Sequence, residues 1–149
     1  MERNFSFDNK SVHFQNLEGT TGQRLKQCRI SKNMTIDEVA NAVGVSPKSI
    51  ILLEKHCSKA SMGTIRKLSS IFDVSIAYLG MFENMPECTL GDRLRKARHF
   101  HGLTKEELAT KIKVDVKTIT NWEDNRRVPR DMEKANQILE ILYNRSNPI

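Results

Sequence analysis

Apolar residues recur at steps of three and four along most of the chain, and no alternating strand pattern appears. This spacing is typical of short amphipathic helices, so the pattern predicts an all-α fold. In the first half we expect helices at residues 36–42, 47 to about 54, 62–72 and 75–79. In the second half we expect one longer last helix at about 131–143, a stop at 146–148 and no clear fifth helix.

The same unit occurs twice in the chain. Residues 22–54 align with residues 91–123 at a constant offset of 69, without a gap. The identical pairs are Gly22/Gly91, Arg24/Arg93, Leu25/Leu94, Arg29/Arg98, Thr35/Thr104, Glu38/Glu107, Ala40/Ala109, Val45/Val114, Lys48/Lys117, Ile50/Ile119 and Glu54/Glu123. Such a repeat predicts two small domains of one fold.

Both copies carry the same signal for the start of a helix. Thr35 is followed three residues later by Glu38, and Thr104 is followed in the same way by Glu107. A threonine and a glutamate at this spacing form a capping box, in which each side chain bonds the backbone of the other residue. The pattern therefore predicts helices that begin directly after Thr35 and Thr104.

The turn that follows differs between the copies. Gly44 is expected to end the first of these helices in the left-handed conformation, whereas Lys113 occupies that place in the second copy. A side chain makes this conformation more costly, so the second turn is expected to be strained or differently shaped. Ser46 with Pro47, and Asp115 in the second copy, predict the caps of the next helices, which run to about residues 54 and 123.

Turn-forming residues divide the chain into segments. We expect an amino-terminal arm at residues 1–20, a first domain at 21–80, a linker at 81–89 and a second domain at 90–149. Gly80, Asn84 and Pro86 mark the linker. The arm is polar, with scattered Phe5 and Phe7, and lacks helical spacing.

Residues 35–54 and 104–123 resemble the helix-turn-helix of the phage-repressor-like family known as XRE or Cro/C1 type. The resemblance covers about residues 21–79 and 90–143, and it implies two tandem helix-turn-helix domains of four to five short helices each. Small Ala40 and Ala109 allow the paired helices to approach closely, and Val45 and Val114 fill the turn between them. The second helix of each pair is then held where it can enter the major groove of duplex DNA.

The resemblance also assigns structural roles. It implies that Arg29 pairs with Glu54, and Arg98 with Glu123, so that the first helix is tied to the end of the recognition helix. These residues are not expected to contact DNA. Leu53 and Trp122 are expected in the core.

The second copy has a polar and basic outward face. The expected DNA contacts are Lys105, Val116, Lys117, Thr118, Thr120, Asn121, Arg126, Arg127 and Arg130. Asparagine can bond adenine bidentately, threonine can offer a hydroxyl or a methyl, and lysine and arginine meet guanine or phosphate. A solvated polar helix is the alternative.

The first copy is more apolar at the matching positions. Its expected DNA contacts are Thr35, Lys48, Ser49, Leu52 and Lys55. Ile51 and Leu52 are expected to be exposed side by side, and exposed apolar neighbours form a sticky surface. Lys48, Ser49, Lys55, His56 and Lys59 could still contact phosphates. Thymine-methyl contact, a protein-binding surface and burial under the arm with its Phe5, Phe7 and Phe14 all stay open, with DNA contact placed first.

Charge and cysteine content narrow the class of protein. The net charge is +6, which divides into −1 for residues 1–20, +4 for 21–84 and +3 for 85–149. Basic surfaces attract polyanions such as nucleic acid, although the surplus is small enough to serve solubility alone. Cys28, Cys57 and Cys88 do not form a disulfide framework, and no membrane span or signal peptide is visible, so a cytoplasmic protein is expected.

Candidates for catalysis or metal binding are weak. His99 and His101 stand two apart, which does not place them on one helix face, so we expect surface histidines rather than a zinc site. His56 and Cys57 lack an orienting third group. The sequence therefore predicts neither an enzyme, nor a cofactor, nor a metal.

Two functions remain as hypotheses. The first is a sequence-specific transcriptional regulator of duplex DNA, a repressor of phage or mobile-element type that acts as a homodimer or through its tandem domains. The alternative is an interaction protein, such as an antitoxin or antirepressor, that binds a protein partner through Ile51, Leu52 and the arm.

Overall fold

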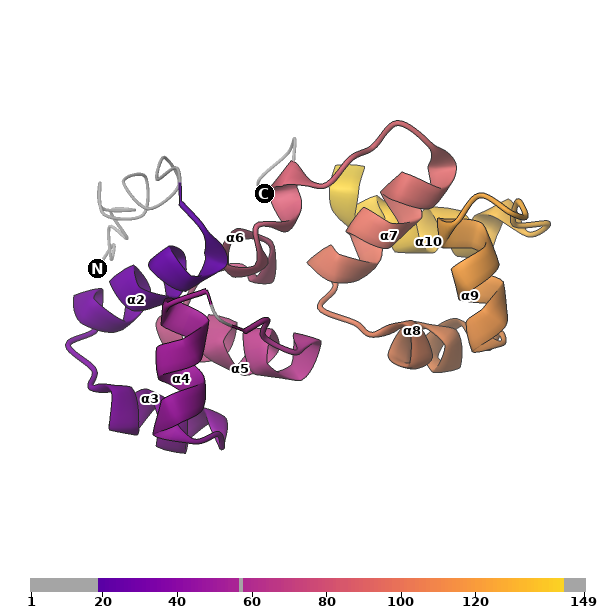
Figure 1. Cartoon of the computed structure of the whole chain (residues 1–149). Helices are drawn as coiled ribbons and strands as arrows, with labels where there is room; N and C mark the ends of the chain where they lie inside the picture. Colours follow the sequence, from indigo (N-terminus) through magenta and orange to yellow (C-terminus); the bar gives the residue numbers. More distant parts are fainter. Residues whose placement is uncertain (1–18, 57, 144–149) are drawn as a thin grey trace, which may run out of the picture. The chain divides into compact units, whose positions relative to one another are not determined.

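The structure is a computed structural model that describes residues 19–56 and 58–143 (Figure 1). Its elements are α2 (Thr21–Ser31), α3 (Ile36–Val43), α4 (Pro47–Glu54), α5 (Met62–Phe72), α6 (Ile76–Gly80), the 3₁₀ turn η1 (Phe82–Asn84), α7 (Leu90–Phe100), α8 (Lys105–Ile112), α9 (Val116–Glu123) and α10 (Met132–Tyr143). No strand occurs among the described residues, and the expected all-α class is confirmed. The expected arm, apart from its last two residues, and the stop at 146–148 lie outside these residues.

Contacts between helices divide the chain into a unit that ends at Ala60 and a unit that begins at Ser61. In the first unit, α4 packs on α2 and α3 (Figure 1). Its buried apolar residues are Leu25, Cys28, Val39, Ala40, Val43, Ile50 and Leu53. In the second unit, α7 packs on α9 and α10, and α8 packs on α9. One core cluster there comprises Leu94, Ala97, Leu108, Ala109, Ile119, Trp122, Ala135, Ile138, Leu139 and Leu142.

Both predicted capping boxes are present. The Thr35 amide donates to the Glu38 carboxylate at 2.7 Å, and the Glu38 amide donates to the Thr35 hydroxyl at 3.2 Å. The corresponding distances for Thr104 and Glu107 are 2.8 and 3.2 Å. These bonds satisfy backbone donors that the first turn of a helix leaves free, so they fix where α3 and α8 begin.

The two turns after these helices have the same shape. Gly44 lies at φ 80° and ψ 37°, and Lys113 lies at φ 57° and ψ 56°, both in the left-handed region. Of the two expected alternatives, strain or a different shape, the structure shows the first, because Lys113 adopts the left-handed conformation although it bears a Cβ. In both copies the next amide, of Val45 or Val114, bonds the carbonyl five residues earlier.

The caps of α4 and α9 are also as predicted. The Ser46 hydroxyl accepts from the Ser49 amide at 3.1 Å, with Pro47 in the first turn of the helix. The Asp115 carboxylate accepts from the Lys117 amide at 2.7 Å. A short-range side-chain bond thus defines where each recognition helix begins.

The first helix of each copy touches the end of the recognition helix through a glycine. A Cβ on Gly91 would lie 2.6 Å from the carbonyl oxygens of both Trp122 and Glu123. The Gly91 amide also donates to the Asn125 side chain at 3.0 Å. A Cβ on Gly22 would likewise collide with the Leu53 carbonyl oxygen. The identity of Gly22 and Gly91 in the repeat therefore reflects a contact with backbone that admits no side chain.

Residues 81–89, expected to be a linker, are bound to α7 within the second unit. The buried Lys96 ammonium donates to the carbonyls of Glu83 and Met85, at 2.8 and 3.0 Å, and pairs with Glu87 at 2.6 Å. Phe82 meets His99 edge-on, with 4.7 Å between ring centroids. A buried ammonium needs such partners, and here the loop carbonyls supply them.

A bidentate ion pair joins α5 to α8 within the same unit. Both terminal nitrogens of Arg66 donate to the Glu107 carboxylate, at 2.8 and 2.9 Å, and one of them also donates to the Gly102 carbonyl. The Arg66 hydrogen bonds, together with the bond from the Thr104 amide, lower the pKa of Glu107 from its ordinary 4.5 to about 2. Glu107 therefore serves both its own helix cap and the packing of α5.

We predict that Gly91→Ala destabilises the second unit. Its methyl would collide with two backbone carbonyls, and overpacking of this kind costs about 1–3 kcal/mol. Gly63→Ala in α5 is the matched control, because its Cβ would meet only side-chain atoms at 3.9 Å. That change is expected to leave stability unchanged or raise it by up to about 1 kcal/mol. Urea unfolding followed by fluorescence of Trp122, the single tryptophan, measures both, and equal stabilities would contradict the close approach.

A second prediction concerns acid. Because the pKa of Glu107 is lowered on folding, its ionised form stabilises the fold above about pH 4.5, and this stabilisation is lost as the pH falls toward 2. Wild type is therefore expected to exceed Glu107→Gln in unfolding free energy at pH 7, by a margin that shrinks between pH 4.5 and 2. Glu106 is exposed in the same helical turn, so Glu106→Gln is the control for the loss of one negative charge. A margin that does not change with pH would contradict the assignment.

Candidate nucleic-acid interface

A buried ion pair fixes the end of α9. The Arg98 guanidinium donates to both Glu123 carboxylate oxygens, at 2.6 and 3.0 Å, and its remaining nitrogen donates to the Leu103 carbonyl at 3.0 Å. The Glu123 side chain is 1% exposed. One guanidinium thereby joins α7, the turn before α8 and the end of α9.

The first unit contains the same arrangement. Arg29 donates to both Glu54 oxygens, at 2.6 and 3.1 Å, and to the Met34 carbonyl at 3.1 Å. Both ion pairs that the resemblance implied are thus present. Leu53 and Trp122, each directly before the glutamate, are buried as expected.

With one side of α9 buried through Ile119, Trp122 and Glu123, the opposite side faces outward. Val116 is 36% exposed and Lys117 is exposed, while Thr118, Thr120 and Asn121 are half-buried. Within the described part of the chain, the Asn121 side-chain amide has no hydrogen-bond partner. The structure therefore brings five of the predicted contact residues together on one short helix.

Lys105 lies beside this face rather than apart from it. Its ammonium donates to the Thr120 hydroxyl at 3.4 Å and lies 3.8 Å from the Glu123 carboxylate. Its side chain is 32% exposed. Sequence reasoning placed Lys105 near the interface but did not identify Thr120 as its neighbour.

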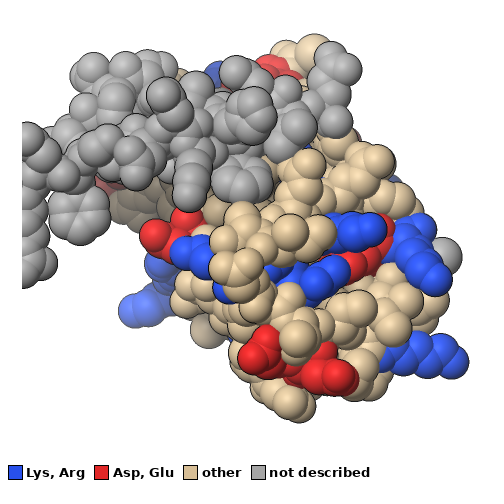
Figure 2. All heavy atoms as spheres, turned by 90° about the vertical axis from the view of Figure 1, so that its left-hand side faces the viewer, with Lys and Arg blue, Asp and Glu red and all other residues tan. Residues whose placement is uncertain are grey.

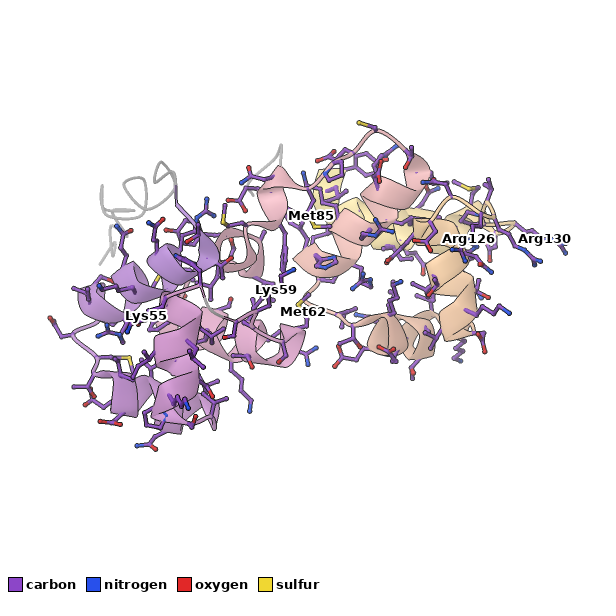
Figure 3. The ribbon with its side chains drawn as sticks, in the orientation of Figure 1. Lys55, Lys59, Met62, Met85, Arg126 and Arg130 are labelled. Carbon is purple, nitrogen blue, oxygen red and sulfur yellow. The ribbon has the colours of Figure 1, made fainter. Side chains whose placement is uncertain are left out.

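The loop from α9 to α10 carries the three predicted arginines, and Figure 3 shows Arg126 and Arg130 on it. Arg126 lies 3.7 Å from Asp124, which Arg95 also binds at 2.8 Å. Arg127 and Arg130 have no ion-pair partner among the described residues. The Asn121 carbonyl accepts from the Arg126 and Arg127 amides, at 2.9 and 3.2 Å, so the loop starts from a fixed point on α9.

An open groove of about 690 Å³ lies between α9 and this loop. The polar and charged residues that line it are Thr118, Asn121, Arg127, Arg130, Asp131 and Lys134. Amide, hydroxyl and unpaired guanidinium groups at one opening suit a ligand with base edges and phosphates.

Comparison with protein families matches residues 25–79 to the family described as Helix-turn-helix, and residues 91–144 to the family described as Helix-turn-helix domain. The chain is a tandem helix-turn-helix protein of the XRE (Cro/C1) type. Families of this kind are DNA-binding and typically not enzymatic. Neither a curated protein nor a solved structure matches the chain.

The first recognition helix of this tandem helix-turn-helix protein is less polar than α9, with exposed and half-buried residues at the same matching positions. Pro47 and Lys48 are exposed, but Ser49, Ile51 and Leu52 are half-buried. Ile51 and Leu52, expected to be exposed side by side, are thus half-buried, as are Thr120 and Asn121 at the matching positions of α9.

The other predicted contacts of the first unit differ in their surroundings. The Thr35 hydroxyl is engaged with Glu38 in the helix cap, and the Ser49 hydroxyl bonds the Ser46 hydroxyl at 2.8 Å. Lys55 follows α4 and is exposed (Figure 3). Figure 2, drawn from the α2–α4 side, shows basic side chains interspersed with acidic ones. This face thus lacks a field of one sign.

The histidines are not the surface residues that the sequence suggested. His99 is half-buried and bonds the Arg95 carbonyl at 2.7 Å, and burial lowers its pKa. His101 bonds the Ile138 carbonyl at 3.0 Å and so joins α7 to α10. Sequence spacing could not reveal these roles, because both partners are backbone carbonyls, one on another helix. Cys57, considered with His56, lies outside the described residues.

The described residues contain neither a membrane-spanning helix nor a metal-binding cluster. None of their helices has the length and apolar character that crossing a bilayer requires. No group of three His, Cys, Asp or Glu side chains gathers there as metal ligands would.

Proposed function

We propose that this protein is a sequence-specific regulator that binds duplex DNA, with α9 as its principal base-reading helix. One observation carries the proposal: α9 presents polar groups on its outward side that have no partner among residues 19–56 and 58–143, and it continues into a loop with two arginines that have none there either. A helix that merely faced solvent would not require this combination of free amide and free cations.

The side chains of α9 suit the major groove. That groove is about 12 Å wide and displays a distinct donor and acceptor pattern for each base pair. Asn121 has an amide without an internal partner, which can donate to N7 and accept from N6 of adenine. Lys117, exposed and without an ion pair among the described residues, can donate to guanine or phosphate.

The arginine loop supports backbone contact. Arg127 and Arg130 lie beside the base-reading face, on the far side of the groove that Asn121 lines. Phosphate contacts supply affinity and register without sequence information. Arg126, paired with Asp124, contributes less free charge than its two neighbours.

The two domains are proposed to contribute unequally. At the positions of Thr120 and Asn121, the first domain has the apolar Ile51 and Leu52, which offer no hydrogen-bonding group to a base. Lys48, Ser49 and Lys55 remain proposed contacts there, in an accessory role.

One small module buries little DNA surface, and specific affinity usually needs two half-sites. Domains at residues 21–80 and 90–149, joined by 81–89, supply two modules in one chain, and a homodimer would supply four. The XRE (Cro/C1) resemblance favours a repressor of phage or mobile-element type.

Selection of bound fragments from random duplex DNA by the full chain tests the proposal. The expected result is one enriched sequence whose affinity falls with salt. Enrichment of no sequence, with equal binding of random duplex, would overturn it.

On the selected duplex, Asn121→Ala is expected to cost about 1–3 kcal/mol and to relax preference at one base pair, because a bidentate contact is lost. Leu52→Ala, at the matching position of the first domain, is expected to cost less than half of that. Titration of each variant on selected and random duplex measures both, with circular dichroism to verify folding. Equal losses would contradict the unequal roles.

Replacement of both Arg127 and Arg130 by glutamine is expected to weaken binding of the selected duplex and of random duplex to the same extent. Each lost phosphate contact lowers the slope of log K against log salt by about 0.9, so the double variant should flatten it by about 1.8. Arg126→Gln is the comparison, with a smaller expected change because Asp124 already lies close. An unchanged slope in the double variant would show that this loop faces away from DNA.

A further inference from the structure

The hydroxyl of Thr120 is turned toward the protein. It donates to the Val116 carbonyl, one helical turn earlier, at 3.2 Å. It also accepts from the Lys105 ammonium at 3.4 Å, and Glu123 lies 3.8 Å from that ammonium on its other side. A hydroxyl has one hydrogen and two lone pairs, so its single hydrogen and one lone pair are used within the domain.

This arrangement limits what Thr120 can offer to a base. Guanine N7 and O6, adenine N7 and thymine O4 are acceptors and require a donor. Thr120 has already donated its hydrogen, so it cannot donate to these acceptors, and its methyl group and one hydroxyl lone pair are left for contact. The only apolar group in the major groove is the C5-methyl of thymine.

A second apolar group lies on the same side of α9. Val116 is four residues before Thr120, which places both side chains on one helix face, and it is 36% exposed. Val116 and the Thr120 methyl therefore form an apolar strip. Lys117 and Asn121, also four residues apart, form a polar strip next to it.

We propose that the apolar strip of Val116 and Thr120 reads the C5-methyl of a thymine. The polar strip can then place Asn121 on a nearby adenine. The inference rests on the proposed function, since it requires α9 to enter the major groove. It assigns to Thr120 a methyl contact instead of a hydrogen bond, with Lys105 as the residue that positions it.

The test replaces each thymine of the selected duplex in turn by deoxyuridine, which lacks only the methyl. Wild type is expected to lose about fourfold in affinity at one thymine, the value for a methyl that binding buries. Thr120→Ser keeps the hydroxyl and lacks the methyl. It is expected to bind the thymine duplex about fourfold more weakly and to be indifferent to deoxyuridine at that position.

Thr120→Val keeps the methyl and lacks the hydroxyl. It is expected to bind within twofold of wild type and to remain sensitive to deoxyuridine. Thr110 supplies the matched control, because it is exposed on α8 and makes the same bond to a preceding carbonyl, that of Glu106, at 3.0 Å. Thr110→Ser and Thr110→Val are expected to leave both affinities unchanged.

The outcomes separate the two proposals. A chain that selects no duplex overturns the proposed function and this inference with it. A selected duplex at which no deoxyuridine effect depends on residue 120 overturns the inference alone. So does a loss of specific binding in Thr120→Val that Thr120→Ser does not share, because the free lone pair of the hydroxyl would then be the reading group.

Discussion

The position of each recognition helix depends on one buried ion pair. Glu123 is almost fully removed from solvent, and a buried carboxylate is tolerated only when it is paired and hydrogen-bonded. Arg98 meets that need with two nitrogens and uses the third to hold the chain before α8. Loss of one partner from a buried pair typically costs about 3–5 kcal/mol, because the other charge stays unpaired. Arg29 and Glu54 do the same in the first domain. The glycine contact at the same helix end makes this approach possible.

The two domains share this ion pair but differ in the side chains on the outward face of the recognition helix. In the first domain, Ile36 occupies the position of Lys105, and Leu52 occupies the position of Asn121. The second domain also surrounds Glu123 with Arg95 and Lys105 in addition to Arg98. These extra cations orient the outward face of α9, because Lys105 reaches Thr120 from its place near the buried carboxylate. The buried Glu123 and the proposed base-reading residue Thr120 are therefore neighbours, linked by Lys105.

Much of the fold could be predicted because its signals are local. The capping boxes of Thr35 and Thr104, the left-handed Gly44 and the caps at Ser46 and Asp115 involve partners within five residues, so spacing alone identifies them. The gapless repeat predicted the second domain and, with the family resemblance, the ion pair of Arg98 with Glu123. Exposure was harder to predict. Ile51 and Leu52 were expected to be exposed, and they are half-buried. Helical periodicity does not report how far neighbouring helices cover a position.

The sequence by itself therefore determined the helices, their caps, the tandem repeat and the set of residues on the outward side of α9. Only the tertiary structure decided which of those groups are free. It engages the Thr120 hydroxyl through Lys105, fifteen residues away, and it leaves Asn121, Arg127 and Arg130 without partners among the described residues. It also binds residues 83–87 to Lys96 and α5 to Glu107. The physical reason is range: periodicity and capping act over one or two turns, whereas the partner of a long polar side chain depends on how separate helices pack.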